Sequence, residues 1–243
     1  MELLFLEKID STNKYVKENL SKLNDKTFVY SNIQTAGRGR LNRSWNSFLG
    51  ENVYATIVLK PSKEIKEVYS NLTQYLCLVL AEIFEEYNVT PKIKWPNDIR
   101  INGKKISGIL AESVFEKGEL KGIVLGFGVN LNCAKVDMEK INQPATSLNL
   151  ETGLEISRED FIKKIIDKFC LGYNNFIEEG FKLIREDYIK RAEFLDKNVT
   201  VRVFDKDISG LAKDITENGA LEIVDKNNEK HVLLIGDILW MKH

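Results

Sequence analysis

The pattern of apolar and polar positions predicts short strands and amphipathic helices along most of the chain. Short apolar runs bounded by turn residues predict strands, and these runs are Glu2–Ile9, Thr27–Ser31, Val53–Leu59 and Leu120–Phe127. Apolar residues that recur every three or four positions predict helices, at Lys14–Leu23, at Ile65–Tyr87, after a capping Ser157 and near Gly180–Ala192. The helix predicted for Ile65–Tyr87 is expected to cover one face of a sheet.

The pattern changes near Leu195, where short β runs replace the helical spacing. These runs are Val199–Phe204, Ile208–Ile215, Ala220–Val224, His231–Ile235 and Ile238–Met241. Short strands separated by turn residues such as Asn218-Gly219 indicate a small barrel of SH3-like size. The sequence therefore predicts two domains, residues 1–194 and residues 195–243.

The composition is typical of a soluble globular protein and argues against several functional classes. The chain has 243 residues, of which 43% are hydrophobic and 29% are charged. No apolar run approaches the ~20 residues of a membrane helix, and the N-terminus is charged too early for a secretory signal. Cys77, Cys133 and Cys170 form no CxxC pair, which fits a reducing cytoplasm and no zinc cluster. The two histidines, His231 and His243, both lie near the C-terminus, which argues against a histidine-based triad and against a multi-histidine metal site. Lysine, arginine, carboxylate and amide side chains remain as candidates for catalysis, together with a hard metal bound by oxygen.

The stretch Gln34–Trp45 combines three arginines with two glycines and an aromatic residue. Arg38, Arg40 and Arg43 present planar forks of donors that suit phosphate and carboxylate oxygens, and Gly37 and Gly39 alternate with the first two. Trp45 is a flat apolar plate suited to cover a ring. The stretch indicates a loop that closes over an anionic, ring-bearing ligand. A solvated loop and a nucleic-acid arm are the alternatives, but a net charge of −1 argues against binding of a polyanion.

A second informative stretch runs from Lys92 to Glu112. Pro96 interrupts two β runs, so that an edge or a bulge is expected there, and Asn97 and Asp98 follow it. Asn102-Gly103 is a strong hairpin signal. Alternation beyond the hairpin then places Lys105, Ser107 and Ile109 on one face, while Gly108 lets a ligand lie against the backbone. A turn for Asp98 and a solvated strand end for Lys105 are the structural alternatives. Together these residues resemble a metal-and-phosphate arrangement.

Small polar residues mark two further positions. Ser11, Thr12 and Asn13 lie between a predicted strand and a helix, where they either cap the helix or bind a polar ligand head. Gly126-Phe127-Gly128 lacks the third glycine of a dinucleotide fingerprint, which rejects that interpretation. Asn130, two residues after Gly128, is positioned to meet a base edge.

Taken together and in order, these motifs resemble those of the biotin protein ligases. They are Ser11-Thr12-Asn13, Gln34–Arg40 with Arg43 and Trp45, Lys94–Asp98, Lys104–Leu110 and Gly126–Asn130. The resemblance covers essentially the whole chain. It implies an α+β fold, with a mixed-sheet catalytic domain related to the class II aminoacyl-tRNA synthetases and a small SH3-like C-terminal barrel. Family members that also repress transcription carry an N-terminal winged helix-turn-helix domain. The first strand begins here at Glu2, so the form that is only an enzyme is expected.

The resemblance also implies a two-step reaction. ATP and biotin give biotinyl-5′-AMP and pyrophosphate with Mg²⁺ as cofactor, and a lysine of a biotin carboxyl carrier domain then takes the biotin. A cytoplasmic protein without nucleic-acid or membrane partners is expected. Homodimers that form through the catalytic sheet are common in the family.

The family roles transfer residue by residue. Biotin is expected to contact Ser11, Thr12, Asn13, Gln34, Arg38, Gly39, Arg40, Lys105 and Gly108. The nucleotide is expected to contact Arg40, Arg43, Trp45, Asn97, Asp98 and Asn130. Asp98 is the expected Mg²⁺ contact. Lys105, Arg38 and Arg40 are the expected catalytic residues, because fixed cations offset the repulsion between a carboxylate and a triphosphate.

One position departs from the family pattern. Asn42 stands where glycine is usual, although asparagine is the residue after glycine that best tolerates positive φ.

Two alternatives to a biotin protein ligase remain open. One is a lipoate ligase, which shares the fold but lacks the Gly-Arg-Gly-Arg loop. The other is a sensor that binds biotin or a nucleotide without turnover.

Overall fold

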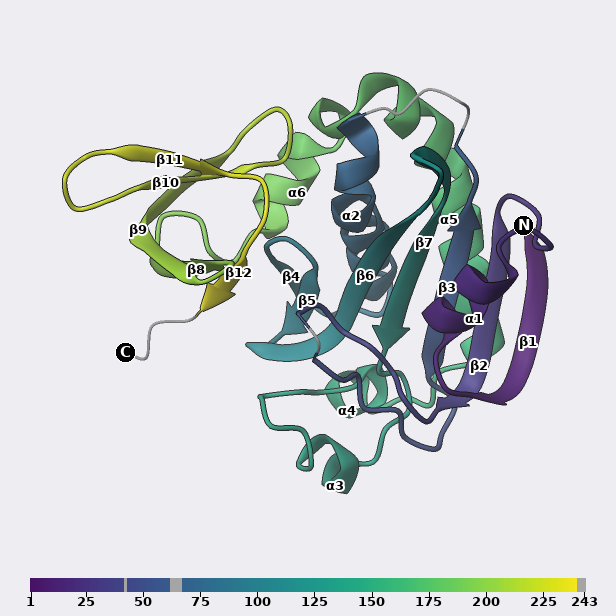
Figure 1. Ribbon diagram of the computed structural model, residues 1–243. Coiled ribbons are helices and arrows are strands. Elements are labelled where there is room, and N and C mark those ends of the chain that lie inside the picture. Colours follow the sequence, from purple (N-terminus) through teal and green to yellow (C-terminus); the bar gives the residue numbers. More distant parts are fainter. Residues whose placement is uncertain (42, 62–66, 240–243) are drawn as a thin grey trace.

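A seven-stranded mixed sheet forms the larger part of the molecule (Figure 1). The computed structural model describes residues 1–41, 43–61 and 67–239. The strand order is β1-β2-β3-β7-β6-β5-β4, in which β1 and β2 are parallel and all other neighbours are antiparallel. The strands are β1 (Glu2–Ile9), β2 (Thr27–Gln34), β3 (Val53–Leu59), β4 (Pro91–Lys94), β5 (Asp98–Ile101), β6 (Lys104–Glu116) and β7 (Glu119–Val129). This arrangement confirms the predicted mixed sheet.

Helices cover the two faces of the sheet unequally. Helices α2 (Leu72–Glu85) and α5 (Arg158–Glu179) pack together on one face and enclose the main apolar core against the strands. The short helix α1 (Thr12–Asn19) packs on β2, β3 and β7 through a separate apolar cluster around Val16 and Leu20. Most of the second face therefore stays available for a site.

Two helix predictions need correction at their boundaries. Helix α2 begins at Leu72, after the 3₁₀ helix η1 (Glu67–Asn71), so the helix predicted for Ile65–Tyr87 is too long, and Ile65 lies outside the described residues. Helix α1 ends at Asn19 and not at Leu23. The caps at Ser11 and Ser157 are confirmed, because each hydroxyl accepts a backbone N–H three residues further on.

The chain after α5 forms a 3₁₀ helix, η2 (Phe181–Leu183), and the helix α6 (Arg185–Arg191). Short helices α3 (Lys135–Met138) and α4 (Leu148–Thr152) precede α5.

The hairpin between β5 and β6 forms as predicted, but the alternation after it does not. Asn102 and Gly103 both have positive φ, 49° and 74°, as a type I′ turn requires. Arg100 then pairs with Lys105 and Ile99 with Ser107, which leaves Ile106 as an extra residue in a β-bulge. The bulge separates Lys105 from Ile109, which is buried in the core, and brings the Lys105 Nζ atom to the open face of Gly108.

The C-terminal residues form a separate five-stranded antiparallel sheet in the order β11-β10-β9-β8-β12. Its strands are β8 (Asn198–Val203), β9 (Lys206–Ile215), β10 (Leu221–Val224), β11 (Lys230–Leu233) and β12 (Asp237–Leu239). The five predicted runs are thus present, although the end of the last one, at Met241, lies outside the described residues. The boundary between residues 194 and 195 stays a prediction.

One contact between the small sheet and the rest of the molecule lies at the turn Asn218-Gly219. The Gly219 carbonyl accepts hydrogen bonds from Gln74 Nε2 at 2.9 Å and from Trp95 Nε1 at 3.2 Å. The neighbouring Asn218 carbonyl accepts one from Asn71 at 3.0 Å. Trp95 is almost fully buried, so this part of the Trp-Pro-Asn-Asp motif has a structural role. Pro96 lies in the turn that follows the edge strand β4, in agreement with the predicted edge.

Among the described residues, no helix combines the length and the apolar character that a membrane span requires.

Candidate functional site

Two adjoining cavities on the open face of the sheet contain all the predicted site residues. The first, here called the polar pocket, is lined by Ser11, Thr12, Asn13, Gln34, Arg38, Trp45, Gly108, Leu110, Gly126, Phe127 and Gly128. The second, here called the charged pocket, is lined among others by Arg38, Gly39, Arg40, Arg43, Trp45, Lys94, Asn97, Asp98, Lys105, Gly108, Leu110, Asn130 and Asp237. Arg38, Trp45, Gly108 and Leu110 line both, so a ligand that spans the two cavities passes between these residues.

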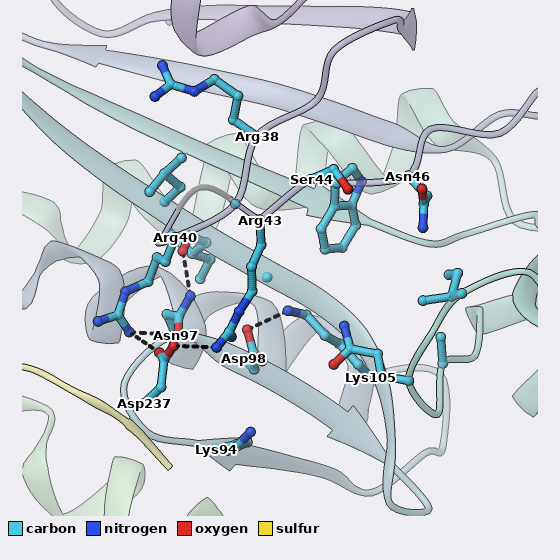
Figure 2. A pocket seen from close by; sticks show the side chains of 18 of the residues that line it. Arg38, Arg40, Arg43, Ser44, Asn46, Lys94, Asn97, Asp98, Lys105 and Asp237 are labelled. Carbon is cyan, nitrogen blue, oxygen red and sulfur yellow. Dashed lines mark hydrogen bonds and ion pairs between the residues drawn. The ribbon is translucent and has the colours of Figure 1, made fainter. Parts of the chain in front are cut away.

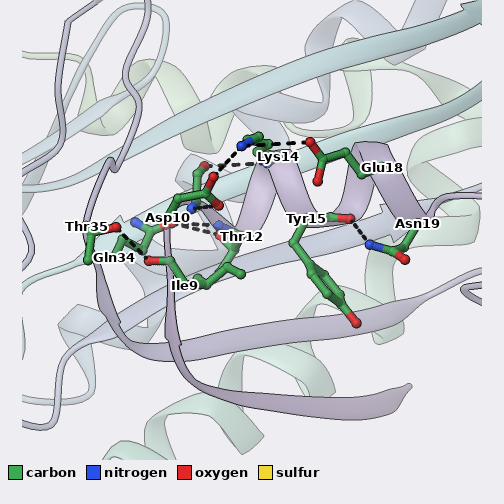
Figure 3. A network of polar contacts seen from close by, with 10 residues as sticks. Ile9, Asp10, Thr12, Lys14, Tyr15, Glu18, Asn19, Gln34 and Thr35 are labelled. Atoms are coloured by element: carbon green, nitrogen blue, oxygen red, sulfur yellow. Dashed lines mark hydrogen bonds and ion pairs between the residues drawn. The ribbon is translucent and has the colours of Figure 1, made fainter.

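The polar pocket begins at the turn from β1 into α1 (Figure 3). Gln34 Oε1 accepts the backbone N–H of Thr12 at 2.8 Å and its hydroxyl at 3.1 Å. The parallel pairing of β1 with β2 places Ile9 opposite Gln34, which brings this amide beside the helix N-terminus. The turn residues Ser11–Asn13 therefore serve as a helix cap and as a cavity wall at the same time.

Asn13 forms the floor of the polar pocket with residues of β3, β6 and β7. Its Oδ1 accepts from the Thr56 hydroxyl at 2.7 Å, and its Nδ2 donates to Glu112 Oε2 at 3.0 Å and to the Leu110 carbonyl at 3.3 Å. A Cβ atom on Gly126 would lie only 1.8 Å from Asn13 Oδ1. Thr56, Glu112 and Gly126 were not among the predicted site residues.

The alternation of side chains along β7 accounts for the two glycines of Gly126-Phe127-Gly128. Leu125, Phe127 and Val129 point into the helix-covered core, so Gly126 and Gly128 alternate onto the opposite face. A Cβ atom on Gly128 would lie 2.3 Å from the Trp45 indole. Glycine is therefore required at both positions by close packing of side chains, and the rejection of a dinucleotide fingerprint is consistent with this.

The arginine-containing loop is closed by its own backbone. Gly39 N donates to the Arg43 carbonyl at 2.8 Å, Arg43 N to the Arg40 carbonyl at 3.1 Å and Trp45 N to the Gly37 carbonyl at 2.9 Å. Asn42, the departure from the family pattern, lies outside the described residues. The loop places its arginines toward two different regions, with Arg38 near Glu112 at 3.7 Å and Arg40 and Arg43 over the charged pocket (Figure 2).

Asp237 of the C-terminal sheet holds the tip of this loop. Its carboxylate lies 3.1 Å from Arg40 and 3.0 Å from Arg43, and Arg40 also donates to the Gly236 carbonyl at 3.2 Å and to Asn97 Oδ1 at 3.2 Å. Asp237 is buried, with an exposed fraction of 7%. Sequence reasoning missed it because nothing local in the sequence around Asp237 indicates a partner nearly two hundred residues away.

Lys105 and Asp98 form the other charged pair of this cavity, 2.7 Å apart (Figure 2). The Lys105 Nζ atom also lies 5.6 Å from the centre of the Trp45 ring. Lys94 faces the same cavity. Burial lowers its pKa, and the nearby positive charges of Arg100 and Lys105 add to this effect, while Asp98 opposes it. Among the ion pairs of the described residues, none involves Lys94, in contrast to the other cations of the pocket.

Asn130 is buried at the end of β7 and lines the charged pocket. Its Nδ2 donates to the Thr146 carbonyl at 3.0 Å, which fixes the orientation of the amide. Trp45 Nε1 is buried and has no hydrogen-bond partner within the described part of the chain. The two residues thus supply an oriented amide and a ring at one cavity.

The side chains of the charged pocket are compatible with a Mg²⁺ ion that takes most of its ligands from bound phosphate groups and water. Within the described residues, the one group of three potential metal-ligating side chains is Asp225, Glu229 and His231 in the C-terminal sheet, away from both pockets. Asp98 is the carboxylate of the charged pocket that pairs with a lysine, whereas Asp237 pairs with two arginines. Mg²⁺ commonly uses one or two carboxylates and completes its shell with phosphate oxygens and water, so Asp98 is compatible with that role.

Comparisons with known proteins agree with this geometry. Residues 5–130 match the biotin/lipoate A/B protein ligase family, and residues 194–239 match the biotin protein ligase C-terminal domain. The chain is 32% identical to the bifunctional ligase/repressor BirA of Bacillus subtilis over 90% of its own length and 68% of that protein. For the corresponding protein of Salmonella typhimurium the identity is 31%, over 88% of this chain and 66% of that protein.

Two further relatives match along nearly their whole length. The biotin–[acetyl-CoA-carboxylase] ligase of Paracoccus denitrificans is 29% identical over 89% of this chain and 91% of its own. The solved structure of the biotin protein ligase from Aquifex aeolicus in complex with biotin and ATP superposes with a TM-score of 0.81 at 27% identity, over 98% of this chain and 97% of that one. The chain therefore belongs to the biotin/lipoate A/B protein ligase family.

Proposed function

We propose that this protein activates biotin with ATP to biotinyl-5′-AMP and transfers the biotin to a lysine of a biotin carboxyl carrier protein. The observation that carries the proposal is the junction of two unlike cavities at Arg38, Trp45 and Gly108. One cavity offers neutral hydrogen-bonding groups for a ureido ring. The other carries Arg40, Arg43, Lys94 and Lys105 for a triphosphate.

In the first step, a carboxylate oxygen of biotin attacks the α-phosphorus of ATP and the bond to pyrophosphate breaks. Both reactants are anions, so the cations of the charged pocket lower the cost of bringing them together, and they stabilise the charge that develops at phosphorus. Lys105 is assigned to the biotin carboxylate and the α-phosphate. Arg38 and Arg40 are assigned to the carboxylate and the adenylate, and Arg43 to the outgoing phosphates.

Binding of the substrates requires an exchange of ion-pair partners. Lys105 leaves Asp98, and Arg40 and Arg43 leave or share Asp237, as phosphate oxygens take their places. Asp98, once released, would hold Mg²⁺ together with the phosphates, and a bound Mg²⁺ would offset their negative charge. Trp45 is assigned to the adenine side, where Asn130 and Asn97 provide amide groups.

In the second step, the ε-amino group of the acceptor lysine attacks the acyl carbon of the mixed anhydride, and AMP leaves. The adenylate is hydrolysable, so the loop around Gly39 is assigned a second task, the exclusion of water and of other nucleophiles.

The test is transfer of label to a carrier domain with ATP and Mg²⁺, compared between biotin and lipoate. Biotin-dependent transfer is expected. Transfer with lipoate alone would assign the protein to the lipoate ligases, and tight binding of biotin without release of pyrophosphate would identify a sensor without turnover.

A further inference from the structure

Glu112 on β6 joins the polar pocket to helix α1 and to the arginine-containing loop. Its Oε2 accepts the hydrogen bond from Asn13, and its Oε1 contacts Lys17 of α1 and lies 3.7 Å from Arg38. The side chain is 17% exposed. Burial raises the pKa of Glu112, but the hydrogen bonds from Lys17 and Asn13 outweigh burial and hold the pKa below its ordinary value. The group is therefore an anion at neutral pH.

The contacts of Glu112 determine which end of the Asn13 amide faces the cavity. One end of the amide meets two acceptors, the Glu112 carboxylate and the Leu110 carbonyl, so this end must be the NH₂ group. The oxygen then points to Thr56 and to the open face of Gly126. An amide oxygen has two lone pairs, and the Thr56 hydroxyl takes one, which leaves the other for a ligand N–H.

Gln34 is oriented in the opposite sense. Its oxygen is engaged by the Thr12 N–H and hydroxyl, so the remaining groups of this pocket-lining amide are the Nε2 donors, which lie beside Gly37. The polar pocket thus presents a fixed acceptor from Asn13 and a fixed donor from Gln34. A cyclic urea offers the matching N–H donors and carbonyl acceptor, whereas a dithiolane ring offers neither.

We propose that Glu112 is a positioning residue for substrate selection, which holds the Asn13 amide with its oxygen toward the pocket and thereby selects a ligand ring with N–H donors. This inference rests on the proposed function, because it assigns the polar pocket to the ureido ring. A flipped Asn13 would bring its oxygen against the Glu112 carboxylate and its NH₂ group against the ligand N–H. A hydrogen bond to a charged group is stronger than one between neutral groups, so the carboxylate contributes more to this orientation than the Leu110 carbonyl does.

The experiment uses the full chain and the exchange of labelled pyrophosphate into ATP, which measures adenylation without a carrier. Glu112→Met removes the acceptor and keeps the side-chain length. Lys17→Met is the matched control, because it removes the other partner of the same ion pair and leaves the Asn13 contact in place. Glu116→Gln makes a charge change at an exposed position of the same strand.

Glu112→Met is expected to raise the KM for biotin roughly tenfold and to leave the KM for ATP within about twofold. Lys17→Met and Glu116→Gln are expected to keep both KM values. Glu112→Gln, which retains one acceptor oxygen, is expected to fall between the wild type and Glu112→Met, and it serves as the test if the methionine variant does not fold.

An unchanged KM for biotin in Glu112→Met would overturn the inference. An equal rise in Lys17→Met, or a parallel rise in the KM for ATP, would also overturn it, because either result would show that Glu112 acts through the packing of α1. Failure of the proposed function looks different, since the wild-type protein itself would then show no biotin-dependent exchange.

Discussion

The polar pocket and the charged pocket adjoin one another, yet they are built in opposite ways. The polar pocket is formed mainly by regular elements, with Arg38 and Trp45 of the loop at its edge, and its neutral groups pair with one another and with Glu112 of β6. The charged pocket takes its cations from a loop and from strand ends, and it pairs them with carboxylates from distant segments, including one from the C-terminal sheet. The difference indicates two tasks, a fixed pattern of donors and acceptors on one side and exchangeable ion pairs on the other.

This contrast has an energetic basis. A neutral hydrogen-bond network keeps its orientation when a ligand enters, because no member must give up its partner. The ion pairs of the charged pocket break or share their cations when phosphates bind, and they keep the cations in place until then. Arg38, Arg40, Arg43, Lys94 and Lys105 outnumber Asp98 and Asp237, so the pocket retains positive charge after every carboxylate is paired.

The largest effect is expected from the charged pocket. Lys105→Ala should lower the rate of adenylation by two or more orders of magnitude, since it removes a fixed cation at the developing charge, a loss of ~3 kcal/mol. Pyrophosphate exchange at saturating biotin and ATP measures this rate. Lys104→Ala, one residue earlier and exposed, is the control. A near-wild-type rate in Lys105→Ala would remove this residue from the mechanism.

Gly126→Ala should break the polar pocket and leave the charged pocket intact. The new Cβ atom would lie 1.8 Å from Asn13 Oδ1, so Asn13 must leave its position. The KM for biotin is expected to rise at least tenfold, or about 1.4 kcal/mol, with the KM for ATP within about twofold. Gly122→Ala lies on the same strand and crowds Leu20 in place of the pocket, and it should change neither KM. Equal effects of Gly126→Ala on both substrates would show that the two pockets are not separable.

Asp237→Asn tests whether the C-terminal sheet positions the loop. The substitution keeps the size of the side chain and removes the charge that Arg40 and Arg43 share. The expected result is an increase of about fivefold in the KM for ATP, which corresponds to the ~1 kcal/mol of a partly exposed ion pair. Asp207→Asn, which breaks an exposed pair with Arg202 in the same sheet, should leave the KM unchanged. A lower KM for ATP in Asp237→Asn would mean that competition between Asp237 and the phosphates outweighs its positioning of the loop.

The features that local sequence determines were predictable. The hairpin at Asn102-Gly103 requires two residues that accept positive φ, and the cap at Ser11 requires a hydroxyl at one position, so each has a signature of a few adjacent residues. The predicted site residues line two adjoining cavities because the motifs that carry them lie at the ends of such elements, and the sheet brings these ends to one face. The roles of the individual residues stay predictions.

The features that depend on distant contacts were not predictable in the same way. Asp237 and Glu112 each lie in an unremarkable strand, and their partners are about two hundred and one hundred residues away. The bulge at Ile106 shifts the register of Lys105 relative to Ser107 by one residue in the pairing with β5. The alternation of apolar and polar residues in the sequence does not indicate this bulge. The glycines of β7 were visible in the sequence, but the close packing of Asn13 and Trp45 against them is a property of the folded sheet.

The smallest effect concerns Lys94, the cation of the charged pocket without an ion-pair partner among the described residues. Because burial lowers its pKa below the ordinary lysine value, Lys94 loses its proton earlier than other lysines as the pH rises. The kcat/KM for ATP, which reports the ionisation of the free enzyme, should therefore fall at a lower pH than the titration of an ordinary lysine would give. Lys94→Met should lower this value roughly threefold at neutral pH and remove that part of its pH dependence. Lys94→Arg keeps its charge throughout the titration of Lys94 and should remove the pH dependence while retaining activity at neutral pH. The same decline with pH in all three proteins would assign it to another group and would leave Lys94 without a part in binding phosphate.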